Sequence, residues 1–252
     1  MLRIATDCAE AVGDARTESV AAPIARQAGV LVPRLIAFDD SRAIVDRPYS
    51  IWERIHGETL GLLPPDALRD RETWRAVGRQ LALLHRRVSE APDPHGWLDH
   101  PDRDMDFAER VATLAASSCI HTSIAKEIER WIEALRPAVA ATTNRCFLHN
   151  DIHDMNVICR QSGSVLAIID WGDAGWGDPA LEFAQIPLAA VPFVMTGYES
   201  EAVDRLGELP EARVIWDKLD YALHGAQNDR RLLDELTHFV RTADDRWRRV
   251  PR

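Results

Sequence analysis

Three polar residues in the segment 147–186 have the types and the spacing that phosphoryl transfer requires. Asp151 and Asn156 are separated by four residues, and Asp170 follows an apolar run at 165–169. A phosphoryl-transfer site needs a carboxylate that orients the attacking hydroxyl and accepts its proton. It also needs oxygen ligands for the Mg²⁺ on a triphosphate. The pattern therefore predicts Asp151 as the base and Asn156 and Asp170 as metal ligands.

The residues between Asn156 and Asp170 predict a β-hairpin. Residues 157–158 and 165–169 are apolar, and the sequence Gln-Ser-Gly-Ser at 161–164 is typical of a turn. A hairpin would return Asp170, at the tip of a buried strand, to the pocket that holds Asp151 and Asn156.

Four motifs occur in order within this segment. They are His149-Asn150-Asp151 with Asn156, then Ile169-Asp170-Trp171, then Gly175-Trp176-Gly177-Asp178-Pro179, then Glu182-Phe183-Ala184. Together they resemble the aminoglycoside phosphotransferase family, a branch of the protein-kinase-like fold that phosphorylates small molecules. The family has Asp where this sequence has Glu182. The resemblance implies ATP and Mg²⁺ as cofactors and a small-molecule hydroxyl as acceptor, on an aminoglycoside, a similar antibiotic or a metabolite.

The resemblance also implies roles for residues near the N-terminus. It makes Arg3 the basic residue that touches the nucleotide phosphates, and Glu18 the acid that pairs with Arg3 from the following helix. It places Glu53 and Ile55 at the hinge between two lobes, at about 53–57, where backbone groups would bond the adenine.

In the family, two strands and a loop over the phosphates precede the basic strand, and this sequence has no counterpart for them before Arg3. Two explanations stay open: the sequence starts inside a longer reading frame, or the small lobe is reduced. The same feature keeps open a non-catalytic alternative, a degenerate kinase fold that binds a small molecule or a protein. The intact Asp151, Asn156 and Asp170 argue against that alternative.

The histidines of the catalytic segment have more than one interpretation. His149 belongs to the catalytic motif with Asp151, and we expect it to bond backbone and fix the pocket. A rival is a metal-dependent hydrolase in which His149, Asp151 and His153 bind the metal. However, the Glu of a zinc-binding HExxH helix is absent. For His153 and Asp154, contact with the acceptor and exposure to solvent both remain open.

The elements around these motifs, together with the resemblance, predict a two-lobed, protein-kinase-like α+β fold. Residues 1–57 should form a truncated small lobe with strands at 2–4, 35–38, 43–45 and 49–52. Its helix is expected at 17–28, capped by Thr17 and stopped at Gly29. Residues 58–252 should form a mainly helical lobe with the catalytic loop at 147–173. Apolar residues repeat there at helical spacing across 74–88, 124–139 and 232–240.

Composition narrows the class of partner. The 252 residues include 30 Lys and Arg against 40 Asp and Glu, a net charge of −10, and 46% are hydrophobic. These fractions describe a globular protein. The acid excess argues against nucleic acid and is compatible with a cationic acceptor. The acidic stretch 99–106 favours a solvated loop over a substrate-attracting patch. The family resemblance implies that acceptor specificity lies in 95–125 and 185–230.

Two further features bear on location. The longest nearly apolar stretch, 187–195, is about half the length that a bilayer requires, so no membrane partner is expected. The four cysteines are scattered without a CxxC pair, which is typical of reduced cysteines in a cytoplasmic protein. The oligomeric state is unknown from the sequence.

Overall fold

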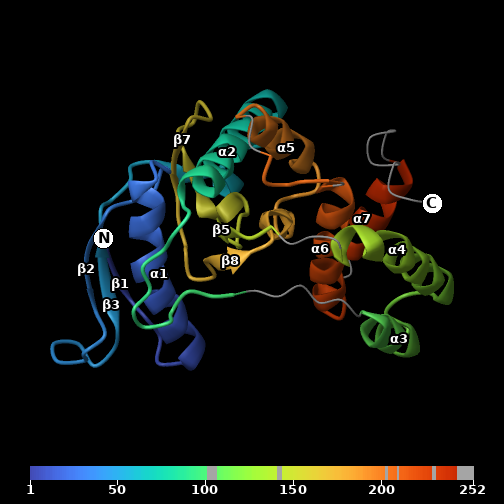
Figure 1. Cartoon of the computed structure of the whole chain (residues 1–252), viewed down its shortest axis with the longest axis horizontal. Coiled ribbons are helices and arrows are strands. Elements are labelled where there is room, and N and C mark those ends of the chain that lie inside the picture. Colours follow the sequence, from blue (N-terminus) through green and yellow to red (C-terminus); the bar gives the residue numbers. More distant parts are fainter. Residues whose placement is uncertain (101–106, 141–143, 202–203, 209, 229–230, 243–252) are drawn as a thin grey trace.

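The computed structural model describes residues 1–100, 107–140, 144–201, 204–208, 210–228 and 231–242. These residues form two lobes, a small one that carries the N-terminus and a larger, mainly helical one (Figure 1). Most of the acidic stretch 99–106 lies outside the described residues.

The small lobe is a three-stranded antiparallel sheet with one helix packed against it. Its elements are β1 (Leu2–Ile4), α1 (Ala9–Gln27), β2 (Leu35–Asp39) and β3 (Tyr49–Trp52). The strand order is β1-β3-β2, with Arg3 opposite Ser50 in the register. Ala21, Ala22 and Ala25 of α1 are buried, and their small side chains let the helix lie close to the sheet.

Two details of the small lobe differ from the sequence-based expectation. Residues 43–45 form a bend instead of a strand, because Ile44 is 80% exposed and does not pack into the core. The helix begins at Ala9, so Thr17 is not its cap. The Thr17 hydroxyl instead donates a hydrogen bond to the carbonyl of Trp97 at 2.6 Å.

The large lobe combines a helical body with short strands that carry the site. Its helices are α2 (Ala67–Arg87), α3 (Ala108–Ala116), α4 (Thr122–Ala140), α5 (Val191–Glu199), α6 (Pro210–Gly225) and α7 (Arg231–Thr242). Its strands are β4 (Glu58–Thr59), β5 (Cys146–Leu148), β6 (Val157–Cys159), β7 (Val165–Ile168) and β8 (Gly175–Gly177). The predicted helices correspond to α2, α4 and α7, and the predicted hairpin is β6–β7.

Helices α2 and α5 pack in close contact through glycines. A Cβ atom on Gly78 would overlap the carbonyl oxygen of Val194, and one on Gly197 would overlap that of Arg75. Two helix backbones can approach this closely only where side chains are absent.

The two lobes are joined by backbone and side-chain hydrogen bonds. The N–H of Ile168, at the end of β7, donates to the carbonyl of Leu31 at 2.7 Å. The N–H of Leu31 in turn donates to Gln80 of α2 at 2.8 Å, and Arg87 donates to the carbonyl of Ala28 at 3.1 Å. After β3 the chain crosses to β4, which pairs with β6. The division at residues 57 and 58 stays a prediction.

Among the residues that the structure describes, no helix combines the length and the apolar character needed to cross a membrane.

Candidate active site

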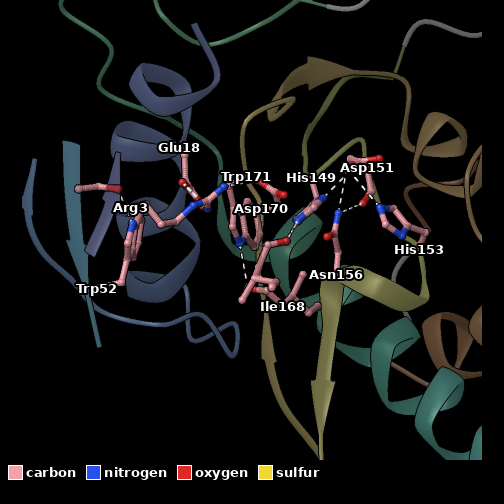
Figure 2. A network of polar contacts seen from close by, with 12 residues as sticks. Arg3, Glu18, Trp52, His149, Asp151, His153, Asn156, Ile168, Asp170 and Trp171 are labelled. Atoms are coloured by element: carbon pink, nitrogen blue, oxygen red, sulfur yellow. Dashed lines mark hydrogen bonds and ion pairs between the residues drawn. The ribbon is translucent and has the colours of Figure 1, made fainter. Parts of the chain in front are cut away.

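The catalytic loop runs from β5 to β6 and turns sharply at its start. Asn150 has a positive φ of 67°, a left-handed conformation that Asn tolerates better than most residues. The turn directs Asp151 toward Asn156, which ends a short 3-10 helix at Asp154–Asn156. Figure 2 shows both side chains with His149 and Asp170.

Asn156 connects the proposed base to the proposed metal site. Its Nδ2 donates to the carboxylate and to the carbonyl of Asp151, both at 2.9 Å. These contacts leave the amide oxygen, which is the atom that a Mg²⁺ ion would bind. The carbonyl of Asn156 accepts a hydrogen bond from Ile169 at 3.0 Å, so Asp170 follows directly beside it. Burial raises the pKa of Asp151, which makes it a stronger base than an exposed aspartate.

His149 is fully buried beneath the loop, and both of its ring nitrogens have partners. Nδ1 accepts from the N–H of Asp151 at 3.2 Å, so Nε2 carries the proton and donates to the carbonyl of Ile169 at 3.0 Å. Burial lowers the pKa of His149, which keeps the ring neutral. The imidazole therefore links the backbone next to Asp151 with the backbone next to Asp170.

This arrangement contradicts a metal triad of His149, Asp151 and His153. The imidazole of His149 has no nitrogen left for a metal. No group of three or more His, Cys, Asp and Glu side chains in the described part of the chain has a metal-binding arrangement. The rival hydrolase interpretation is therefore wrong on geometry.

Arg3 connects the small lobe with Asp170. Its guanidinium contacts both carboxylate oxygens of Glu18, at 2.8 and 2.9 Å, and one oxygen of Asp170 at 3.2 Å. Asp170 has a positive φ of 66° and is half-exposed, so its carboxylate faces the space between the lobes. Glu18 is buried, and that burial raises its pKa to about 7 despite the opposing effect of Arg3. Figure 2 shows this chain of contacts.

The predicted hinge residues lie directly after β3. The N–H of Glu53 donates to the carbonyl of Arg34 at 2.9 Å, and its carboxylate accepts from the N–H of Arg34 at 3.1 Å. Within the described residues, the carbonyl of Glu53 and the N–H of Ile55 form no hydrogen bond. They are the backbone groups that an adenine ring could use.

Sequence reasoning missed how the catalytic loop is held. Glu182 is fully buried, and its carboxylate accepts from the N–H of His149 at 2.7 Å and from that of Asn150 at 3.0 Å. Its other contact is His85 of α2, at 3.4 Å, and His85 in turn contacts the hydroxyl of Tyr198 at 2.7 Å. Burial opposes the charge of Glu182, but these hydrogen bonds outweigh it and lower the pKa.

The motif that contains Glu182 is visible in the sequence, but the partners of Glu182 are not. We call these four buried residues the Glu182 network: His85, His149, Glu182 and Tyr198. A sequence shows an acid after Gly-Asp-Pro and a histidine at a helix end, yet it does not show that they meet. Asp178, by contrast, acts locally as the cap of the short helix at Pro179–Phe183, since its carboxylate accepts from the N–H of Ala180 at 2.9 Å.

The two-lobed fold, with a β-hairpin that brings an Asp-x₄-Asn loop to a second Asp, defines a kinase-like class of protein. A family model described as the phosphotransferase enzyme family matches residues 2–213. The chain belongs to that family, and the resemblance in its sequence is confirmed.

Curated relatives and solved structures agree with this assignment. A thiamine kinase of Salmonella paratyphi A is 28% identical over 168 residues. That match spans 60% of this chain and 60% of the relative's length. A gentamicin complex of APH(2'')-IIa superimposes with a TM-score of 0.58 at 17% identity, covering 96% of this chain and 84% of that one. A choline/ethanolamine kinase family protein from Mesorhizobium loti superimposes with a TM-score of 0.60 at 20% identity. That superposition covers 98% of this chain and 84% of the other. These structures confirm the kinase-like two-lobed fold.

Proposed function

We propose that this protein transfers the γ-phosphate of ATP to a hydroxyl group of a small molecule. One observation carries the proposal: Asp151, Asn156 and Asp170 meet at a single site. Asn156 binds the Asp151 carboxylate through its amide and adjoins Asp170 through its backbone. A base beside two oxygen ligands is the arrangement that phosphoryl transfer needs.

In this mechanism Asp151 orients the acceptor hydroxyl and takes its proton as the oxygen attacks the γ-phosphorus. The new O–P bond forms while the bond to ADP breaks. Asn156 fixes the carboxylate through its amide N–H. Arg3, held by Glu18, would bind phosphate oxygens. Asn156 and Asp170 would hold Mg²⁺, which neutralises part of the triphosphate charge.

The acceptor is proposed as an aminoglycoside, a similar antibiotic or a metabolite with a free hydroxyl. The kinship with thiamine kinases and the likeness to a gentamicin-bound structure support this range. The acid excess of the chain is compatible with a cationic acceptor. Phosphorylation of an antibiotic would confer resistance. We place the reaction in the cytoplasm, where ATP is available and where the chain's free cysteines would stay reduced.

The test is Asp151→Ala, assayed for ADP formation and for Mg-ATP binding by calorimetry. We expect transfer to fall by at least about a thousandfold, since base and orientation are lost together, while Mg-ATP binding is largely unchanged. Asp170→Ala should instead weaken Mg-ATP binding itself. Retained turnover in Asp151→Ala would contradict the assignment of the base. Mg-ATP binding without turnover in the wild type would indicate a non-catalytic binder.

A further inference from the structure

A cavity of about 740 Å³ lies beside the catalytic loop, between the segment 184–189, α6 and α7. His153 and Asp154 of the loop form its wall on the side of Asp151. The Nε2 of His153 lies 3.6 Å from the Asp151 carboxylate, so one imidazole separates the proposed base from the cavity. Cavities of roughly 300–1,000 Å³ accommodate drug-sized molecules. This cavity therefore has room for a small-molecule acceptor, and its wall at His153 is in contact with Asp151.

Apolar and aromatic side chains from all three elements line the cavity. They include Ile186, Leu188, Tyr221, Ala222, Leu232 and Leu236. Tyr221 is 39% exposed and Leu188 is half-buried, so both present surface that a ligand can cover. An apolar or aromatic ring gains free energy by burial against such a surface, whereas a polyhydroxylated amine does not.

The charged groups of the lining include both signs: two acids, one guanidinium and one lysine, whose pKa burial lowers to about 7, whereas the chain as a whole has ten more acids than bases. They are Asp154, Glu235, Lys218 and Arg231. The amine of Lys218 is buried and donates to the carbonyls of Ala184 and Ile186, so it is engaged with backbone. A cavity for a polycation would instead concentrate acidic groups.

We propose that the acceptor is a small alcohol with an apolar or heteroaromatic ring and at most one positive charge, as opposed to a polycationic aminoglycoside. This inference rests on the proposed phosphoryl transfer. The ring would lie between Leu188, Tyr221 and Leu232, and the hydroxyl would pass His153 to reach Asp151. His153 then limits which acceptors reach the base.

The experiment is calorimetric titration of the 252-residue chain with thiamine, 2-phenylethanol and kanamycin, in parallel with an assay for ADP formation. Thiamine and 2-phenylethanol should bind about tenfold more tightly than kanamycin. Leu188→Lys should weaken the binding of thiamine and of 2-phenylethanol by about tenfold, because it brings a charge to the apolar wall. Ala189→Lys at the exposed rim should act in the same direction with less risk to folding. Leu68→Lys, on the exposed face of α2, is the matched control and should change nothing.

Tighter binding of kanamycin than of either ring alcohol would overturn the proposal, and so would ring-alcohol binding that is absent or unaffected by both cavity variants. The assay for ADP formation distinguishes failure of this proposal from failure of the proposed phosphoryl transfer. ADP formation with kanamycin alone would overturn only the acceptor class, whereas no Asp151-dependent ADP formation with any acceptor would count against phosphoryl transfer.

Discussion

Glu182 shows how a single residue can control a site that it does not enter. Its two carboxylate oxygens accept from consecutive backbone N–H groups at the start of the catalytic loop. Those groups lie where Asn150 adopts its left-handed conformation, and in the part of the chain that the structure describes the pairing of β5 with β8 ends one residue earlier, at Leu148. The position of Asp151 therefore depends on an acid 31 residues further along the chain.

Replacing Glu182 with Ala should destabilise the fold and abolish transfer. Two N–H groups in a buried environment would lose their acceptor, at about 1–3 kcal/mol each, so the free energy of unfolding should fall by about 2–6 kcal/mol. Urea denaturation measures the change. Glu182→Asp, the residue common in the family, should keep part of the stability. Glu90→Ala, at an exposed site, is the control for a lost glutamate. A stability loss no larger than that of the control would mean that Glu182 does not hold the loop.

At the level of elements, the packing of α2 on α5 sets the geometry of the Glu182 network, because α2 carries His85 and α5 carries Tyr198. Gly78 makes that packing possible. Gly78→Ala should force the helices apart and cost at least about 1–3 kcal/mol, as overpacked cores do. It should also lower the rate of transfer through the displaced His85.

The control for Gly78→Ala is the same substitution at Gly13, an exposed position in α1. A Cβ there meets no atom within 4 Å. Gly13→Ala should stabilise the protein by up to about 1 kcal/mol, because alanine favours a helix. Thermal unfolding of the two variants makes the comparison, and equal stabilisation by both would contradict the close packing of α2 and α5.

Elements were predictable where a local pattern determines them. The hairpin β6–β7, the amphipathic helices and three of the four proposed small-lobe strands follow from turn residues and apolar spacing. The start of α1 was not predictable, since Thr17 looks like a cap but bonds Trp97, 80 residues away. Pro23 also lies inside α1, where burial of the alanine face outweighs its local cost.

The site likewise has residues that a local pattern predicts and residues that it does not. Asp151, Asn156 and Asp170 lie in a motif whose spacing predicts their meeting. The partners of Glu182 and the lining of the cavity depend on contacts between distant segments, and no local pattern encodes those contacts.

At the scale of the whole molecule, the lobes meet through a group that titrates near neutral pH. Burial raises the pKa of Glu18 from its ordinary 4.5 to about 7, and Glu18 holds the Arg3 that contacts Asp170. Between about pH 4.5 and 7 the folded state therefore binds a proton that the unfolded state has released. By linkage, the free energy of unfolding therefore decreases as pH rises through that window. Above pH 7 the full cost of ionising the buried Glu18 is present.

Glu18→Gln should remove the part of the pH dependence of stability that comes from Glu18. The difference in unfolding free energy between wild type and variant should change progressively between pH 5 and pH 7.5, with the wild type relatively more stable at the acid end. Urea denaturation at several pH values measures it. A difference that is constant over this range would show that Glu18 is ionised throughout.

The Glu182 network also has a consequence for how the protein is made. His85 and Tyr198 are 113 residues apart, and His85 and Glu182 are 97 apart. At a synthesis rate of about 5–20 residues per second, a ribosome needs on the order of 10 s to go from the first of these residues to the last. During that time the nascent α2 exposes the face that α5 will cover, and the catalytic loop emerges before the acid that fixes it. The Glu182 network can thus be completed only after Tyr198 has left the exit tunnel, so the packing that fixes the catalytic loop is a late event in the synthesis of this protein.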